Sequence, residues 1–102
     1  MRALHHPKRD QIQLAAVLYA LSDPTRLAVV RQLAEEGERA CGTFELPTTK
    51  ATLSHHFKVL RESGLTHTRS EGVYRFISLR REDLDARFPG LLASVLKAAR
   101  KG

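Results

Sequence analysis

The segment Pro47–Leu65, PTTKATLSHHFKVLRESGL, predicts a turn, one amphipathic helix and a glycine stop. Thr49 precedes the helix, where its hydroxyl can accept hydrogen bonds from backbone N–H groups that have no helical partner. Gly64 follows it, where a left-handed backbone ends a helix without a Cβ penalty. Apolar residues recur between them at three- and four-residue spacing, namely Leu53, Phe57, Val59 and Leu60. We therefore expect a helix with one buried face.

The opposite face of this helix carries small, hydrogen-bonding and basic side chains but no acid: Lys50, Ala51, Ser54, His55 and Lys58. Solvated helix faces normally mix both signs of charge. An acid-free face favours an anionic partner, because basic side chains bind a phosphate backbone by releasing its counterions. We interpret the segment as a recognition helix for double-stranded DNA.

The positive charge of the chain is concentrated around this helix. The formal net charge is +6, and seven Lys or Arg but only two acids lie between Lys50 and Arg81. This bias favours nucleic acid as the partner. The absence of Trp and the 6% content of aromatic residues argue against a base-stacking platform for single strands.

Length and cysteine usage narrow the class of protein. A chain of 102 residues suffices for one small domain. The single cysteine, Cys41, excludes an internal disulfide framework and fits a reducing cytosol. No apolar run approaches the roughly 20 residues of a membrane span, and the N-terminus has no secretory signal pattern. We expect a cytoplasmic protein without membrane association.

Helical and β-prone runs follow one another along the chain. Residues 1–9 predict a mobile basic tail, and Asp23 with Pro24 marks a helix start. A hairpin is expected around Glu71-Gly72, where two β-prone runs meet. The expected helices, apart from the recognition helix, are Gln11–Leu21, Thr25–Glu35, a weak one over Ala40–Leu46, and a last one that begins at Glu82 and is interrupted by Pro89-Gly90.

Two of these helices have more apolar surface than one small core can cover. The first is apolar on most sides, and the last carries a clear stripe beyond the core. Packing against a second copy of the chain explains both, so we predict a homodimer. The residues expected at its interface are Ile12, Ala15, Ala16, Tyr19, Leu91, Leu92, Val95 and Leu96.

Two motifs, Leu21–Leu27 (LSDPTRL) and Leu53–Leu65 (LSHHFKVLRESGL), resemble the ArsR/SmtB family of bacterial repressors. The resemblance runs from about Leu14 to the C-terminus. It implies a mainly α-helical winged helix-turn-helix fold with a small β-hairpin, in which residues 10–102 form a DNA-binding domain dimerising through its terminal helices. Such homodimers place two recognition helices in successive major grooves of an inverted-repeat operator. An effector then weakens DNA binding.

The resemblance also assigns DNA contacts by position. Thr52 and Ser54 suit base edges or phosphate, and Lys50 suits phosphate. His56 matches a position that is His in many relatives, with a structural or phosphate-contact role. The full expected set is Lys50, Ala51, Thr52, Ser54, His55, His56 and Lys58 on the helix, with Arg69 and Arg75 on the wing.

The chain departs from the family at both of its known metal sites. An ungapped alignment places Glu38 and Ala40 where the family's metal-sensing cysteines stand, and Asp83–Lys101 contains no histidine. We therefore expect no metal and no cofactor. Cys41 is the remaining candidate sensor, through redox chemistry; the alternative is a small buried hydrophobe.

Two other classes of protein fit the sequence less well. The five histidines lie in three separate segments without acid or Cys partners at catalytic or metal spacing, so an enzyme is not expected. The second class is a winged-helix protein–protein interaction module that binds no operator. An acid-free helix face favours DNA over this alternative, because a protein-docking face usually presents exposed apolar anchors.

Overall fold

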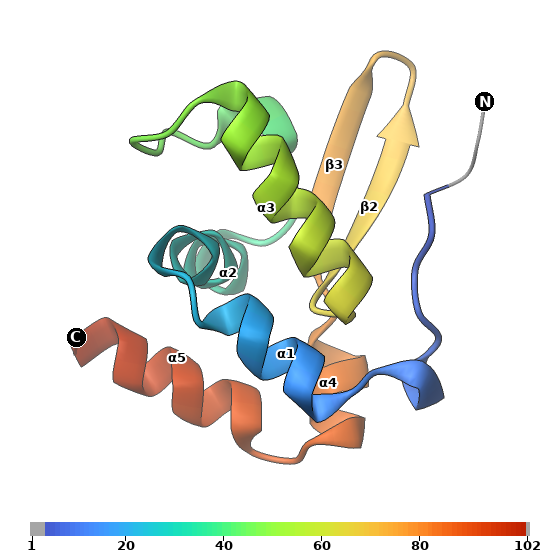
Figure 1. Cartoon of the computed structure of the whole chain (residues 1–102), viewed down its shortest axis with the longest axis vertical. Helices are drawn as coiled ribbons and strands as arrows, with labels where there is room; N and C mark the ends of the chain where they lie inside the picture. The colour runs from blue at the N-terminus through green and yellow to red at the C-terminus, as the bar shows by residue number, and fades with distance from the viewer. Residues whose placement is uncertain (1–3, 102) are drawn as a thin grey trace.

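A computed structural model describes residues 4–101 and shows a helical body from which a β-hairpin wing projects (Figure 1). The helices are α1 (Leu14–Leu21), α2 (Pro24–Glu36), α3 (Lys50–Ser63), α4 (Arg81–Arg87) and α5 (Leu91–Lys101), with 3-10 turns η1 (Arg9–Gln11) and η2 (Cys41–Thr43). The strands are β1 (Arg39–Ala40), β2 (Thr66–Glu71) and β3 (Tyr74–Leu79), antiparallel in the order β1-β3-β2. The expected mainly helical winged fold is confirmed.

Helix α3 begins and ends where the sequence predicts. The Thr49 hydroxyl accepts the N–H of Thr52 at 3.1 Å. At the other end Gly64 has a φ of +91°, and the N–H of Leu65 reaches the carbonyl of Leu60 at 3.1 Å. Leu60 itself is fully buried among α1, α2 and the sheet. The helix is thus fixed by local capping and by one apolar face.

The wing alternates between a buried and an exposed face. Ile77 on β3 is fully buried and lies opposite Thr68 on β2. Towards the turn the hairpin leaves the core, and Val73 and Tyr74 are 92% and 64% exposed. The hairpin therefore has a root within the body and a solvated tip.

The start of the first helix differs from the expectation. Helix α1 begins at Leu14, whereas we predicted Gln11, because residues 8–11 form a 3-10 turn closed by the N–H of Gln11 on the carbonyl of Lys8 at 2.8 Å. Ile12 then takes an extended conformation and is 1% exposed. The turn directs Ile12 into the core.

The weak helix expected over residues 40–46 is wrong. Arg39 and Ala40 form strand β1 against β3, and the chain then makes only the short turn η2. The Thr43 hydroxyl donates to the carbonyl of Ala40 at 2.6 Å, a local bond that competes with helix formation. Gly42 lowers helix propensity further.

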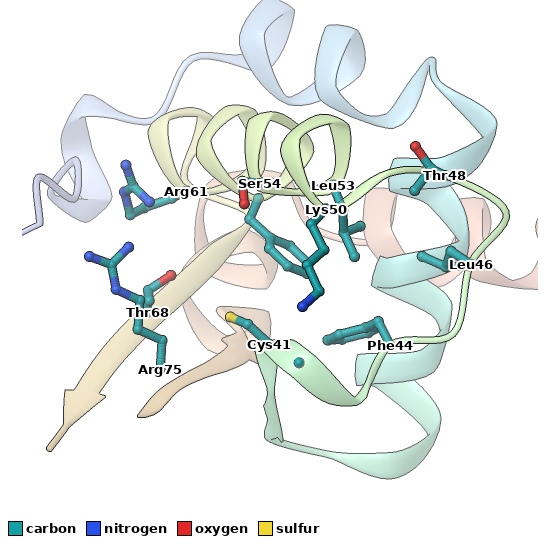
Figure 2. A pocket seen from close by; sticks show the side chains of 12 residues that line it. Cys41, Phe44, Leu46, Thr48, Lys50, Leu53, Ser54, Arg61, Thr68 and Arg75 are labelled. Carbon is teal, nitrogen blue, oxygen red and sulfur yellow. The ribbon is translucent and has the colours of Figure 1, made fainter. Parts of the chain in front are cut away.

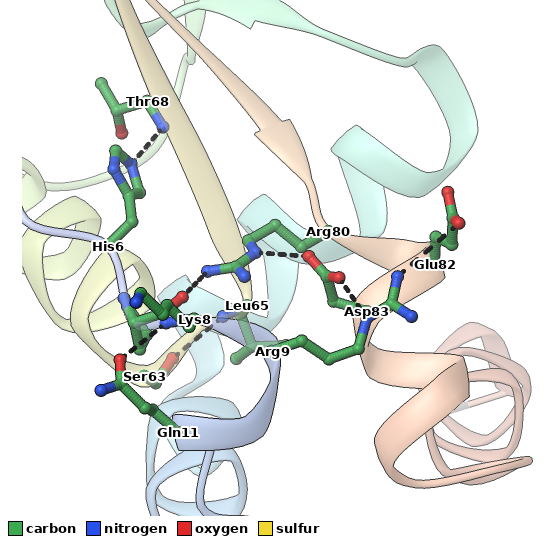
Figure 3. Close-up of polar contacts among 11 residues, drawn as sticks. His6, Lys8, Arg9, Gln11, Ser63, Leu65, Thr68, Arg80, Glu82 and Asp83 are labelled. Carbon is green, nitrogen blue, oxygen red and sulfur yellow. Dashed lines mark hydrogen bonds and ion pairs between the residues drawn. The ribbon is translucent and has the colours of Figure 1, made fainter.

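The predicted mobile tail is not what residues 4–9 form, because His6 and Pro7 are hydrogen-bonded to the body of the protein (Figure 3). His6 Nε2 accepts the N–H of Thr68 at 3.0 Å, and its ring stacks on His67 at 4.3 Å. Burial and the neighbouring His67 and Arg61 charges lower the pKa of His6, which keeps the ring a neutral acceptor. Met1–Ala3, the rest of the predicted tail, lie outside the described residues.

An arginine and an aspartate join this segment to α4. Arg80 donates to the carbonyl of Pro7 at 2.7 Å and to Asp83 at 2.9 Å, while Arg9 reaches Asp83 at 2.7 Å (Figure 3). Hydrogen bonds from Arg9 and Arg80 hold the pKa of Asp83 below its usual value despite partial burial.

Within residues 4–101, no helix is long and apolar enough to cross a membrane.

Candidate nucleic-acid interface

The exposed face of α3 carries the residues that the sequence assigned to DNA. Ala51, Thr52, His55 and Lys58 are all exposed, and their spacing places them on one side of the helix. The first acid on this side is Glu62, one turn beyond Lys58. The first turns of the helix therefore present an acid-free surface to solvent, suited to a polyanion.

Lys50 and Ser54 lie at the edge of that surface. Both are exposed, and both also line a hollow beside the helix, together with Leu53, Phe57 and Arg61. Helix α3 therefore has three sides: one buried in the core, one facing solvent and one facing the hollow. The sequence pattern distinguished only the first two.

His56 is the exception among the expected contacts, because it is only 9% exposed. Its Nδ1 lies 3.2 Å from an Nη atom of Arg26, and its Nε2 lies 3.8 Å from the Asp23 carboxylate. A guanidinium can only donate, so Nδ1 is the acceptor and Nε2 carries the hydrogen that faces Asp23. His56 thus has the structural role, and its expected phosphate contact is wrong.

Arg26 is the centre of this buried network, and sequence reasoning missed it. Its side chain is 5% exposed and donates to the carbonyls of Ala20 at 2.7 Å and Tyr19 at 3.2 Å. Burial opposes ionisation of Asp23, but backbone N–H donors from Arg26 and Thr25, with His56, lower its pKa. The network fixes α3 against the α1–α2 corner, so it positions the recognition surface.

The two arginines expected on the wing differ in their surroundings. Arg69 binds Glu38 at 2.8 Å and also Glu71, and it lies over the ring of Phe76. The Arg69 hydrogen bond lowers the pKa of Glu38 below its usual value, so this pair is ionised at neutral pH. Arg75 is exposed and makes no ion pair within residues 4–101. Most of the uncompensated charge of the wing therefore comes from Arg75.

Neither a metal site nor an activated thiol emerges at this face. Within the described part of the chain, no three His, Cys, Asp or Glu side chains gather as a metal site would require. Burial raises the pKa of the Cys41 thiol, and the nearby Arg75 and Arg61 offset this only in part. A reactive thiol requires the opposite shift. The structure therefore favours the alternative of a partly buried, protonated cysteine.

Some of the residues expected at a dimer interface are buried within the chain itself, and the others are at least partly exposed. Ile12, Leu92 and Leu96 are 9% exposed or less and belong to the core of the chain itself, so they are not available to a partner. Ala15 and Tyr19 are exposed, whereas Ala16, Leu91 and Val95 are half-buried. Sequence reasoning left out the two exposed leucines of α1, Leu14 at 45% and Leu18 at 47%.

The chain is similar in sequence to helix-turn-helix proteins, in agreement with this fold. Residues 21–69 match the family model described as a helix-turn-helix domain. The chain is 42% identical over 89 residues to the uncharacterized HTH-type transcriptional regulator YceK of Bacillus subtilis (strain 168), covering 84% of this chain and 88% of YceK. It is 36% identical over 74 residues to the arsenical resistance operon repressor of Staphylococcus xylosus, covering 72% and 71%.

A solved structure shares both the fold and part of the sequence. The transcriptional repressor BigR from Xylella fastidiosa superposes with a TM-score of 0.63 at 31% identity, over 86% of this chain and 80% of BigR. The matched residues of the family model include both the Asp23–Arg26 corner and helix α3. The resemblance therefore spans the buried network and the exposed surface together.

Proposed function

Since the chain belongs to the ArsR/SmtB family of winged-helix transcriptional regulators, which bind double-stranded DNA and are not enzymes, we propose that it is a homodimeric repressor of an inverted-repeat operator. The single observation that supports this most is the acid-free exposed surface of α3. The repressor role follows that of the Staphylococcus xylosus and Xylella fastidiosa relatives. The protein acts in the cytoplasm and is released from DNA by a non-metal signal.

The proposed division of labour follows side-chain chemistry. Ser54 and His55, with Thr52 and Ala51, face base edges in the major groove, where hydrogen bonds and apolar contacts carry sequence information. Lys50, Lys58 and Arg75 bind phosphates. Arg69 contributes less, because Glu38 and Glu71 already compensate its charge.

The direct test is selection from a random pool of duplex DNA with the full chain, followed by a salt series on the enriched sequence. We expect two inverted half-sites about 10 base pairs apart, centre to centre, and an affinity that falls steeply with salt. Salt-dependent binding without an enriched motif would contradict an operator-specific role. No binding to any duplex would favour the protein–protein interaction module.

Three alanine variants separate reading of bases from binding of phosphates. Ser54→Ala and His55→Ala should each reduce discrimination between operator and random DNA by about 1–3 kcal/mol. Lys50→Ala should weaken both equally and flatten the salt dependence. Lys97→Ala on the distant helix α5 is the matched control for the loss of one charge. Competition titrations measure both affinities, and equal losses on both DNAs for all three variants would refute the assignment.

The dimer is proposed to form through the exposed stripe of α1, centred on Leu14 and Leu18, extended by the half-buried Leu91 and Val95 of α5. Leu91 of α5 lines an apolar recess together with Val17 and Leu21 of α1, so the two helices are neighbours. Leu18→Asp should convert the dimer to a monomer in analytical ultracentrifugation. Val73→Asp, at the 92% exposed wing tip, should remain dimeric. A wild-type monomer, or a dimeric Leu18→Asp, would contradict this interface.

A further inference from the structure

A hollow of about 380 Å³ lies beside the recognition helix, between α3, the η2 segment and the wing (Figure 2). Its volume falls within the range of small-molecule sites. The two ends differ in chemistry. Guanidinium groups of Arg61 and Arg75 gather with Thr68 at one end, and Lys50 reaches over the middle. Apolar side chains line the remainder, namely Phe44, Leu46, Leu53 and Phe57.

The hollow lies where residues 40–46 do not form the helix that we expected. The chain makes one short turn at Cys41–Thr43 and then continues without regular structure to the N-cap of α3. From this segment the Phe44 ring lies against Phe57, with the two ring centroids 5.4 Å apart. The apolar flank of α3 is half-buried.

Two buried polar atoms of this hollow have no hydrogen-bond partner. They are Nε of Arg61 and Oγ1 of Thr68, and the Thr68 residue is only 7% exposed. Buried polar groups are normally paired, and leaving one unpaired costs stability. In addition, none of Arg61, Arg75 and Lys50 makes an ion pair with any residue from 4 to 101. Three cations and an unpaired hydroxyl thus line a single cavity.

We propose that this hollow binds a small organic anion, a carboxylate with an aromatic or branched apolar body. The carboxylate accepts hydrogen bonds from Arg61, Arg75 and the Thr68 hydroxyl, a geometry that guanidinium groups favour. The body packs on Phe57, Phe44 and the neighbouring leucines. The apolar lining selects an organic acid over inorganic phosphate, which would fill only the basic end.

The site has a direct route to regulation, which rests on the function proposed above. Lys50 and Ser54 belong both to the hollow and to the DNA-facing edge of α3. A bound carboxylate attracts the Lys50 ammonium away from a phosphate, and a bound apolar body lies against Ser54. Occupancy therefore opposes operator binding, and by linkage operator binding opposes occupancy to the same extent.

Calorimetric titration of the full chain without DNA tests the site independently of the proposed function. The probes are 3-phenylpropionate, 4-methylpentanoate, the neutral 3-phenylpropionamide and inorganic phosphate. We expect at least one acid to bind, with the amide and phosphate weaker by about tenfold or more, since a charge-assisted bond is lost with the amide and the apolar contact with phosphate.

Two substitutions at residues outside the proposed DNA contacts test how the carboxylate is bound. Arg61→Gln and Thr68→Val should each weaken acid binding by about tenfold. Thr68→Val keeps the shape of the side chain and removes an unpaired hydroxyl, so its fold is maintained. Arg81→Gln, an exposed arginine on α4, should bind the acid as the wild type does.

Each outcome bears on a different part of the proposal. Equal binding of the acid and its amide, unchanged binding by both variants, or no binding of either acid would overturn the site. Acid binding that leaves operator affinity unchanged would overturn its regulatory role alone. Acid binding by a chain that binds no DNA would refute the proposed function and leave the site standing.

Discussion

Replacing Gly64 with alanine should lower the free energy of unfolding by about 3 kcal/mol, from two costs that coincide at this residue. The φ of +91° is one that residues with a Cβ adopt only under strain. A Cβ built there would also lie 2.6 Å from Cγ1 of Ile12, which is 1% exposed and belongs to the core. The midpoint temperature of thermal unfolding should then fall by roughly 15 °C.

Gly72→Ala is the control for this prediction. Gly72 lies in the turn of the hairpin with a φ of +60°, and nothing lies within 4 Å of its Cβ position. The loss of stability there should reflect backbone strain alone, about 1–2 kcal/mol. Urea denaturation of both variants measures the difference. Equal losses at the two glycines would show that Ile12 yields freely, contrary to our expectation. Gly64→Ala should also cost less in an Ile12→Ala background, because the contact is then absent.

Local chemistry made α3 predictable. Its start depends on the Thr49 hydroxyl and its end on Gly64, so both limits follow from the residues in and beside the helix. The same holds for α2, where Asp23 accepts the N–H groups of Thr25 and Arg26 beside Pro24. Capping signals act within a few residues, and sequence reasoning therefore finds them.

Contacts between distant residues were not predictable in this way. Arg69 pairs with Glu38, 31 residues away, and β1 pairs with β3 at the point where the helix expected at residues 40–46 would begin. Because Ile12 is apolar, the sequence allowed it either in a dimer interface or in the core. Only its packing beside Gly64 in the folded chain decides between the two. His6 likewise gains its role from Thr68, 62 residues away.

The buried network connects the two motifs that defined the family. Asp23 and Arg26 come from the first motif, and His56 comes from the second, 30 residues beyond Arg26. Their contact joins the two motifs in space: the first forms a corner between α1 and α2, and the second places the recognition helix on it. The position of the exposed surface of α3 therefore depends on a cluster in which Arg26 and His56 are themselves buried.

Replacing Arg26 with methionine should accordingly destabilise the fold by about 3–5 kcal/mol, the usual consequence of removing one partner from a buried polar network. Methionine fills much of the same volume but leaves the carbonyl of Ala20 and Nδ1 of His56 without this donor. Urea denaturation with circular dichroism measures the loss. Arg31→Met, on the same helix, is the matched control.

Arg31 is half-buried and its Nε has no partner, so methionine there should change stability by less than about 1 kcal/mol. Similar losses at the two arginines would refute a special role for the network.

The Arg26→Met substitution should also affect DNA binding. At a temperature where Arg26→Met remains folded, its operator affinity should fall although Arg26 is 5% exposed, because α3 is no longer held in one position. Unchanged affinity would show that packing of Leu60 alone suffices to position the recognition helix.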